Sequence, residues 1–150
     1  ELMLMGGKTA TESIEPDVII GIDGTLAFDT PDLQGKQADI RIGGGPALKW
    51  MDAIRGKLAA FVPNQVMANQ IYEIAQKLSI PIQNEIVVGI STAITPMIYA
   101  SKGARACALS IPIRYHHTPI EMAHLHDVEN SVLLLKGLLM DSAQEFFTLE

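Results

Sequence analysis

The sequence predicts an α/β fold in one domain, with a buried sheet flanked by helices. Segments with strand character alternate along the chain with segments of helical periodicity, as in folds that cover a sheet with helices. Hydrophobic residues make up 48% of the 150 residues and charged residues 19%, which is enough apolar material for one core at this length. No repeat or linker divides the sequence, so we assign residues 1–150 to a single domain.

Three apolar runs are predicted as strands. Val18–Ile22 is continuously apolar, which indicates a strand buried on both faces that ends at Asp23. Glu85–Val88 and Arg105–Ile111 have the length and composition of further strands. The run Gly43–Pro46 lacks the Gly-Lys-Ser/Thr of a phosphate loop, so we interpret it as a turn.

Four segments are predicted as helices: Lys8–Ile14, Asn64–Leu78, Ala93–Ser101 and a closing helix from Asp127 to about Ser142. The second is the clearest, because its apolar residues recur at helical spacing and Asn64 can cap its first turn. Asp127 is expected to cap the last helix in the same way.

The composition argues against several classes of partner. With a net charge of −6 and no basic stripe, the chain is not expected to bind nucleic acid, which needs clustered Lys and Arg. No apolar stretch reaches the roughly 18 to 20 residues that span a bilayer, and the first residues lack the basic region of a signal peptide. The single cysteine, Cys107, lies in an apolar run and is expected to be buried and inert. We therefore expect a cytoplasmic protein without a membrane partner.

The two ends of the sequence suggest a fragment of a longer protein. The chain begins at Glu1 without an initiator methionine and ends in Leu149-Glu150. Its apolar composition also indicates that it packs against something else or was cut from something larger.

All four histidines lie within eleven residues: His116, His117, His124 and His126. Neutral imidazole is a good zinc ligand. On an extended segment adjacent side chains point in opposite directions, so at most one of His116 and His117 is expected to face a given metal. The other ligands would be carboxylates from distant segments, with Asp23 and Glu1 as candidates. Such a shell suits a catalytic site that keeps a position open for water.

Three segments resemble the glutamyl/deblocking aminopeptidase family of dinuclear metallopeptidases: Glu1–Gly7, Asp17–Pro31 and Ser110–Glu121. The third is the most specific, because Arg-Tyr-His-His-Thr-Pro-Ile-Glu at residues 114–121 is similar to the family's Arg-Tyr-x-His-Ser-Pro-x-Glu. The resemblance implies the C-terminal half of a metallo-aminopeptidase catalytic domain. It also implies a three-layer sandwich whose mixed, largely buried sheet is flanked by helices, and a tendency to form homo-oligomers.

The resemblance also implies a set of site residues. In the family, two divalent metal ions, which can be zinc, cobalt or manganese, act on the N-terminal bond of a peptide substrate. By position, Asp23 resembles an Asp ligand of the first metal and His117 the His ligand of the second, with Glu1 as the Glu that partners it. The family's general-base Glu would precede Glu1, so no catalytic residue is assigned. The remaining ligands belong to the family's N-terminal half.

One segment departs from the family. The family's Gly-Gly-Thr-Asp-Ala-Gly turn is replaced by Ile90–Thr95, in which Ala93 stands where the family has Asp. Ile90 and Ile94 are expected to crowd the approach of a ligand to the helix start. We therefore expect a metal-dependent aminopeptidase whose isolated 150 residues hydrolyse little or nothing. The alternative is a non-catalytic, degenerate family member that acts as an oligomerising or interaction protein.

A second resemblance concerns a different class of enzyme. Residues 22–26, Ile-Asp-Gly-Thr-Leu, are similar to part of the Asp-x-Asp-Gly-Thr-Leu motif of haloacid-dehalogenase-like phosphatases. The nucleophilic Asp of that motif falls on Gly21. No phospho-aspartyl intermediate can form at a glycine, so we disfavour this reading.

Overall fold

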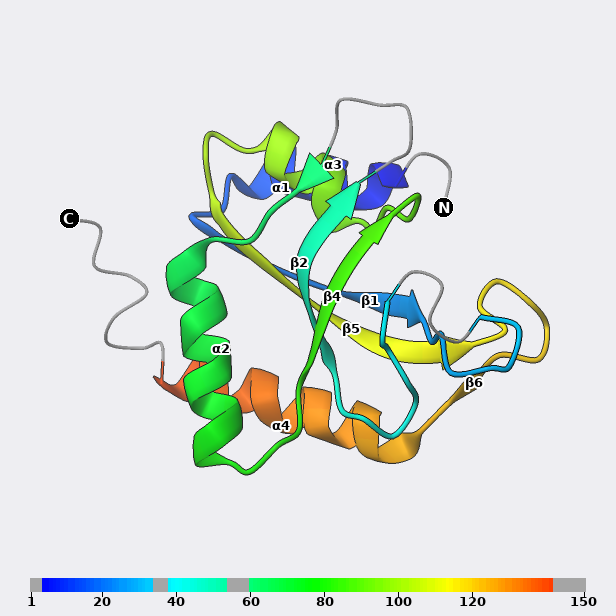
Figure 1. Ribbon diagram of the computed structural model, residues 1–150. Helices are drawn as coiled ribbons and strands as arrows, with labels where there is room; N and C mark the ends of the chain where they lie inside the picture. Colours follow the sequence, from blue (N-terminus) through cyan, green and yellow to red (C-terminus); the bar gives the residue numbers. More distant parts are fainter. Residues whose placement is uncertain (1–3, 34–37, 54–59, 142–150) are drawn as a thin grey trace.

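The computed structural model describes residues 4–33, 38–53 and 60–141. In this part of the chain six strands form one sheet, accompanied by four helices (Figure 1). Their order is α1 (Met5–Ile14), β1 (Val18–Leu26), β2 (Ala47–Ala53), β3 (Ala60–Phe61), α2 (Gln65–Lys77), β4 (Gln83–Val88), α3 (Ile94–Ala100), β5 (Arg105–Arg114), β6 (Met122–Ala123) and α4 (Leu125–Asp141).

The sheet is mixed, with β5 at its centre. β1 pairs with β5 in parallel, and β2 pairs with β5 antiparallel through Ala47 opposite Ser110 and Leu48 opposite Leu109. β2 in turn pairs in parallel with β4 and antiparallel with β3, while β6 pairs antiparallel with the end of β5. Figure 1 shows β2 and β4 crossing β1 and β5 at a steep angle, so the sheet curls.

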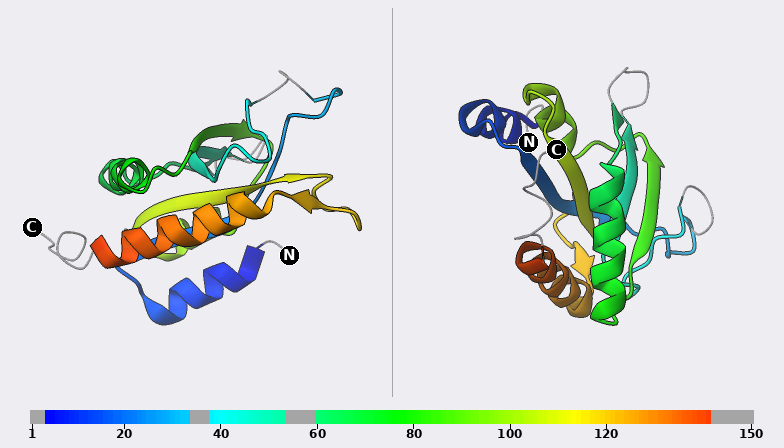
Figure 2. Two further views of the ribbon diagram at one scale, coloured as in Figure 1. Left: turned by 90° about the horizontal axis from the view of Figure 1, so that it is seen from below. Right: turned by 90° about the vertical axis from the view of Figure 1, so that its left-hand side faces the viewer.

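Helices cover both faces of this sheet, as β5 demonstrates. Its residues Cys107 and Leu109 belong to an apolar core with α2 and α4, whereas Ala106 and Ala108 belong to a second core with Ile94 of α3. α1 packs on α3, and α2 packs on α4. Figures 1 and 2 show α1 and α3 on one side of the sheet and α2 and α4 on the other. The predicted α/β three-layer sandwich is therefore confirmed.

The first strand differs from its prediction at its end. β1 does not stop at Asp23 but runs on to Leu26, in parallel register with β5 throughout. Ile22 is 53% exposed, so the expected burial on both faces is wrong there. The reason is topological, because β1 is the terminal strand of the described sheet.

The helices largely agree with the periodicity. Asn64 caps α2, its side chain accepting hydrogen bonds from the backbone N–H groups of Val66 and Met67 at 3.1 and 3.2 Å. The expected cap at Asp127 is wrong: α4 begins two residues earlier, and the fully buried Asp127 carboxylate binds the backbone of the glycine turn before β2. The expected end at Ser142 lies outside the described residues.

Two expectations from composition can be checked directly. Cys107 is fully buried, and burial raises the pKa of its thiol to about 12, which makes the thiol inert as expected. Among the described residues, every helix is too short or too polar to cross a membrane.

Candidate functional site

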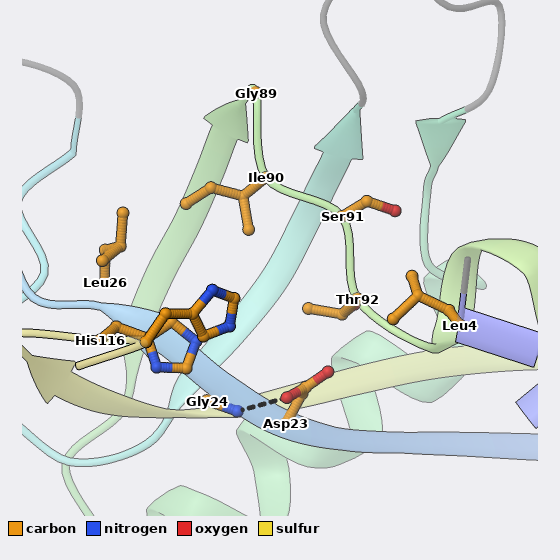
Figure 3. Close-up of a pocket in the computed structure, with 10 residues that line it drawn as sticks. Leu4, Asp23, Gly24, Leu26, Gly89, Ile90, Ser91, Thr92 and His116 are labelled. Carbon is orange, nitrogen blue, oxygen red and sulfur yellow. Dashed lines mark hydrogen bonds between the residues drawn. The ribbon is translucent and has the colours of Figure 1, made fainter. Parts of the chain in front are cut away.

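A cavity of about 320 Å³ lies where the end of β1 meets the turn that follows β5. Its lining residues are Leu4, Asp23, Gly24, Leu26, Gly89, Ile90, Ser91, Thr92, His116 and His117. Figure 3 shows Asp23 and His116 on one side of this pocket and the segment Gly89–Thr92 on the other. Two residues singled out from the sequence, Asp23 and His117, thus line one pocket. Glu1, the third, lies outside the described residues.

Asp23 is placed by the last part of β1. Its Oδ1 accepts a hydrogen bond from the backbone N–H of Gly24 at 2.8 Å (Figure 3). The glycine matters, because a Cβ there would stand 2.6 Å from Cδ1 of Ile113 and 3.1 Å from Cε1 of His116. The Asp-Gly pair therefore lets a carboxylate and an imidazole approach the same strand end.

The two adjacent histidines do not point in opposite directions, and that expectation is wrong. Residues 115–117 form a turn instead of an extended segment, because Tyr115 and His117 adopt the left-handed conformation with φ of 56° and 64°. The His116 and His117 rings lie 4.1 Å apart between centroids. Thr118 stabilises the turn by donating from its hydroxyl to the carbonyl oxygen of Tyr115 at 2.6 Å. Both imidazoles consequently line the pocket.

Glu121 organises this histidine turn. Its Oε1 accepts a hydrogen bond from the backbone N–H of His117 at 2.5 Å and lies 3.0 Å from Nδ1 of His116. These contacts hold the pKa of the Glu121 carboxyl below its usual value, and the hydrogen bond from the His117 backbone is the largest cause. A carboxylate at Nδ1 orients an imidazole and favours presentation of its other nitrogen. Sequence reasoning missed His116, although the Glu four residues after His117 was a signal for such an arrangement.

The opposite wall of the pocket is held by Asp52 of β2. Its Oδ2 accepts hydrogen bonds from the Thr92 backbone N–H at 2.7 Å and from the Thr92 hydroxyl at 2.6 Å. Burial raises the pKa of the Asp52 carboxyl, against the lowering effect of the Thr92 hydrogen bonds. Ile90 lines the pocket as expected. Ile94 does not, because it is buried in the core against Gly21.

A buried ion pair joins β2 and β4. Nζ of Lys49 in β2 is 2.8 Å from Oε1 of Glu85 in β4, and both side chains are fully buried. The hydroxyl of Thr25 donates a hydrogen bond to the same Glu85 oxygen. Thr25 lies two residues after Asp23 on β1, so the two side chains share a face of the sheet. The ion pair joins β2 to β4, and the Thr25 hydrogen bond connects both to the strand that carries Asp23.

The pocket supplies one carboxylate and two imidazoles. Oxygen and nitrogen donors of these kinds suit zinc, cobalt or manganese. Within the described ranges, however, no three His, Cys, Asp or Glu side chains are grouped closely enough to hold a metal ion. The donors fit a divalent ion in kind, and further ligands would have to come from outside the described residues.

The sequence profile of the M42 glutamyl aminopeptidase family matches residues 1–134. Lysyl aminopeptidase of Pyrococcus furiosus is 34% identical over 149 residues, which cover 99% of this chain and 40% of that protein.

Solved structures agree in fold. Aminopeptidase APDkam598 from the archaeon Desulfurococcus kamchatkensis has a TM-score of 0.82 and 33% identity, covering 91% of this chain and 37% of that one. A Pyrococcus horikoshii TET1 peptidase, described as assembling into a tetrahedron or a large octahedral shell, has a TM-score of 0.68 and 27% identity. The match covers 90% of this chain and 36% of the TET1 peptidase chain. The chain thus spans about two-fifths of the length of the proteins that it matches.

Proposed function

This chain belongs to the M42 glutamyl aminopeptidase family, and on that premise we propose that it contributes to a metal-dependent aminopeptidase that removes N-terminal residues from peptides. The observation that carries the proposal is the convergence of Asp23 and His117 on one pocket from segments more than ninety residues apart. We propose that residues 1–150 are the C-terminal half of the catalytic domain of such an enzyme.

The proposed metal ligands are Asp23 and His117, together with Glu1, for a site that holds two divalent ions such as zinc, cobalt or manganese when complete. Bound divalent ions lower the pKa of water and stabilise negative charge on a peptide carbonyl oxygen. The chain's own residues prepare this chemistry. Gly24 keeps the approach to Asp23 open, and Glu121 fixes the turn that presents His117.

No residue of the described pocket is assigned the part of general base. Hydrolysis needs a carboxylate that takes a proton from water and passes it to the leaving amine, and the family's base would precede Glu1. We therefore propose that the 150 residues alone hydrolyse little or nothing.

The alternative is a non-catalytic family member that acts through association. Ala93, which stands where the family has Asp, is the observation that supports this alternative. Self-association is proposed in either case, because the TET1 peptidase of similar fold is described as a large assembly. We also retain the cytoplasm as the proposed compartment, since the sequence has a single cysteine and therefore uses no internal disulfide.

Metal titration tests the proposal. Zinc or cobalt should bind the metal-free chain in calorimetry, and His117→Ala or Asp23→Asn should each weaken binding about tenfold or more, because each removes a ligand. His124→Ala is the matched control, since His124 is a histidine of the same cluster that does not line the pocket. Unchanged metal binding in His117→Ala would remove the ligand assignment.

Activity is tested separately with aminoacyl p-nitroanilides. We expect negligible turnover by the 150-residue chain with or without added metal. Turnover that a chelator abolishes would contradict the expected inactivity and would support the family reaction in this chain.

A further inference from the structure

Ile90 forms an aliphatic wall of the pocket that Asp23 and His117 share. Its side chain is half-buried, and Figure 3 shows it directed from the segment after β4 towards Leu26 and His116. Leu26, the last residue of β1, lines the same pocket. Leu26 and Ile90 also pack against the same apolar core. Two aliphatic side chains therefore stand in one cavity with a carboxylate and two imidazoles.

The backbone holds Ile90 in this place. The N–H of Gly89 donates to the carbonyl oxygen of Ala53 at 2.7 Å, and Ile90 itself forms an antiparallel bridge with Ala53. Two residues further on, the Asp52 carboxylate accepts hydrogen bonds from the backbone N–H and the hydroxyl of Thr92. The segment is thus fixed on both sides of Ile90, and its side chain is a permanent part of the pocket wall.

The hydroxyl groups beside Ile90 are not available to a ligand. The Thr92 hydroxyl donates to Asp52 at 2.6 Å. The hydroxyl oxygen of Ser91 is buried, and Figure 3 shows it pointing away from Ile90. This wall therefore offers a ligand aliphatic carbon and no side-chain hydrogen bond. A polar group placed against it would lose its hydrogen bonds to water without gaining new ones.

The wall is a property of this chain within its family. Ile90 stands at the first position of the segment that resembles the family's Gly-Gly-Thr-Asp-Ala-Gly turn, where the family has glycine. A glycine has no side chain to contact a ligand at this position. Segments outside the 150 residues can add further walls to the pocket, but they do not change the side chain that stands at residue 90.

A substrate would place a side chain in this same cavity. In the proposed aminopeptidase, the carbonyl group of the bond to be cleaved lies at the ions held by Asp23 and His117. The Cβ of the N-terminal residue is only two bonds from that carbonyl carbon, so its side chain lies close to these ligands. Resting on the proposed function, we propose that Ile90 is a specificity-determining residue. Together with Leu26 it binds an aliphatic side chain of the substrate's N-terminal residue, such as that of leucine.

Two ligands of nearly equal shape test the preference. A hydroxamate group binds zinc through its oxygens, so an amino acid hydroxamate holds its side chain beside the ion. In calorimetry with the zinc-loaded chain, leucine hydroxamate should bind about tenfold or more tightly than asparagine hydroxamate, because the carboxamide finds no partner at the wall. Both side chains are uncharged and branch at the same carbon. Acetohydroxamate, which has no amino acid side chain, is the reference for binding to zinc alone.

A matched pair of variants assigns the preference to Ile90. Ile90→Thr makes the wall polar and should weaken leucine hydroxamate by about fourfold or more, since about one methylene of aliphatic contact is lost. It should leave acetohydroxamate within about twofold of the parent, because the zinc ligands are unchanged. Ile86→Thr is the control, because Ile86 is 59% exposed on β4 and does not line the pocket.

Methyl NMR of the parent chain gives a second readout that does not depend on the folding of a variant. With isoleucine methyl groups labelled, leucine hydroxamate should shift the Ile90 signals and show cross-relaxation between the Ile90 methyls and its own. The signals of Ile94 should stay in place, because this side chain is buried in the core against Gly21. Acetohydroxamate should cause no such cross-relaxation.

The outcomes separate this proposal from the one on which it rests. If acetohydroxamate binds but leucine and asparagine hydroxamates bind equally, the specificity of Ile90 is refuted and the metal site stands. The same holds if Ile86→Thr weakens leucine hydroxamate as much as Ile90→Thr does, or if the Ile90 methyls show no contact with the bound ligand. A chain that binds neither zinc nor any hydroxamate would remove both the proposed aminopeptidase site and the role of Ile90 in it.

Discussion

At the scale of single residues, the pair formed by Asp29 and Arg114 fixes the loop after β1 to the end of β5. Nε and Nη2 of the guanidinium each donate to one carboxylate oxygen at 2.8 Å. These hydrogen bonds are the main cause that lowers the pKa of the Asp29 carboxyl. The pair anchors the strand end from which the histidine turn departs.

Asp29→Asn should therefore lower the free energy of unfolding at neutral pH. The pKa of the Asp29 carboxyl is lower in the folded state than its usual value of 3.8. The contribution of this carboxylate to the free energy of unfolding is therefore fully present above pH 3.8 and is lost as the pH falls through the folded-state pKa. Urea unfolding at pH 7 should separate the variant from the parent, and the difference should shrink in acid. Asp32→Asn, a neighbouring carboxylate outside this pair, is the control, and an effect of Asp29→Asn that persists unchanged in acid would contradict the assignment.

The buried pair Lys49 and Glu85 gives a second prediction. Glu85→Gln leaves the Lys49 ammonium buried without its counter-charge, which should cost about 3–5 kcal/mol in free energy of unfolding. Lys49→Met/Glu85→Gln removes both charges while keeping an acceptor for Thr25, so it should cost clearly less than the two single changes together. Urea unfolding of the four proteins measures the coupling. Strict additivity would show that the two charges do not interact in the folded protein.

Site residues differ in how far the sequence could predict them. Asp23 and His117 could be proposed because they stand in recognisable segments at fixed positions. Lys49, Asp52 and Glu85 could not, because charged residues in a strand are normally exposed. Their burial depends on partners 36 to 60 residues away in the chain, such as Thr25 for Glu85 and Thr92 for Asp52. Only the three-dimensional pairing of strands brings these groups together.

At the scale of elements, the cap of α2 gives a prediction of stability. Asn64→Ala removes the acceptor for the N–H groups of Val66 and Met67 and should cost about 1 kcal/mol in free energy of unfolding. Asn64→Asp should retain most of the stability, because a carboxylate caps equally well. Thermal and urea unfolding provide the measurement, with Gln76→Ala on the exposed face of α2 as the control. Equal losses in Asn64→Ala and Asn64→Asp would show that the cap is not responsible.

The start of α4 is tied to the glycine turn before β2. Asp127 accepts hydrogen bonds from the backbone N–H groups of Gly43 at 2.6 Å and Gly45 at 2.8 Å. Gly45 has φ of +91°, and a Cβ there would stand 2.0 Å from the carbonyl oxygen of Pro81. The turn therefore needs both its glycine and the distant carboxylate.

Asp127→Ala should cost about 2–3 kcal/mol in free energy of unfolding, because it leaves two buried or half-buried N–H groups without an acceptor. The free energy of unfolding of Asp127→Asn should lie between that of Asp127→Ala and that of the parent, since an amide offers only one accepting oxygen. Gly45→Ala should be at least as damaging as Asp127→Ala. A stable Gly45→Ala protein, measured by thermal unfolding, would contradict the close approach to Pro81.

Elements with regular patterns could be predicted, and irregular ones could not. The periodicity of α2 and the apolar run of β5 determine those elements locally. β2 contains the charged residues Lys49 and Asp52, and its pairing with β4 shifts register between Lys49 and Met51. Its sequence therefore shows neither a continuous apolar run nor a regular alternation of apolar and polar residues. β3 and β6 are two residues long each, which is too short for any periodicity.

At the scale of the whole molecule, the alternation of elements predicts an α/β sandwich but not the order of its strands. The mixed sheet follows from the resemblance to the family. The local patterns of β1 and β5 are compatible with either direction of pairing. The exposure of Ile22 shows what the sequence cannot predict. A continuous apolar run predicts burial on both faces even when the strand is the terminal one of the described sheet.

This position of β1 predicts a pattern of amide hydrogen exchange. Because the Ala27 N–H donates to Ile113 of β5, the odd-numbered residues of β1 direct their N–H groups towards β5 and the even-numbered ones away from it. The amides of Ile19 and Gly21 should therefore exchange on the order of a hundredfold more slowly than those of Ile20 and Ile22, although all four lie in one strand. Exchange followed by NMR resolves the individual amides. Equal protection of both sets would contradict the terminal position of β1 and would show that another segment pairs with its outer edge.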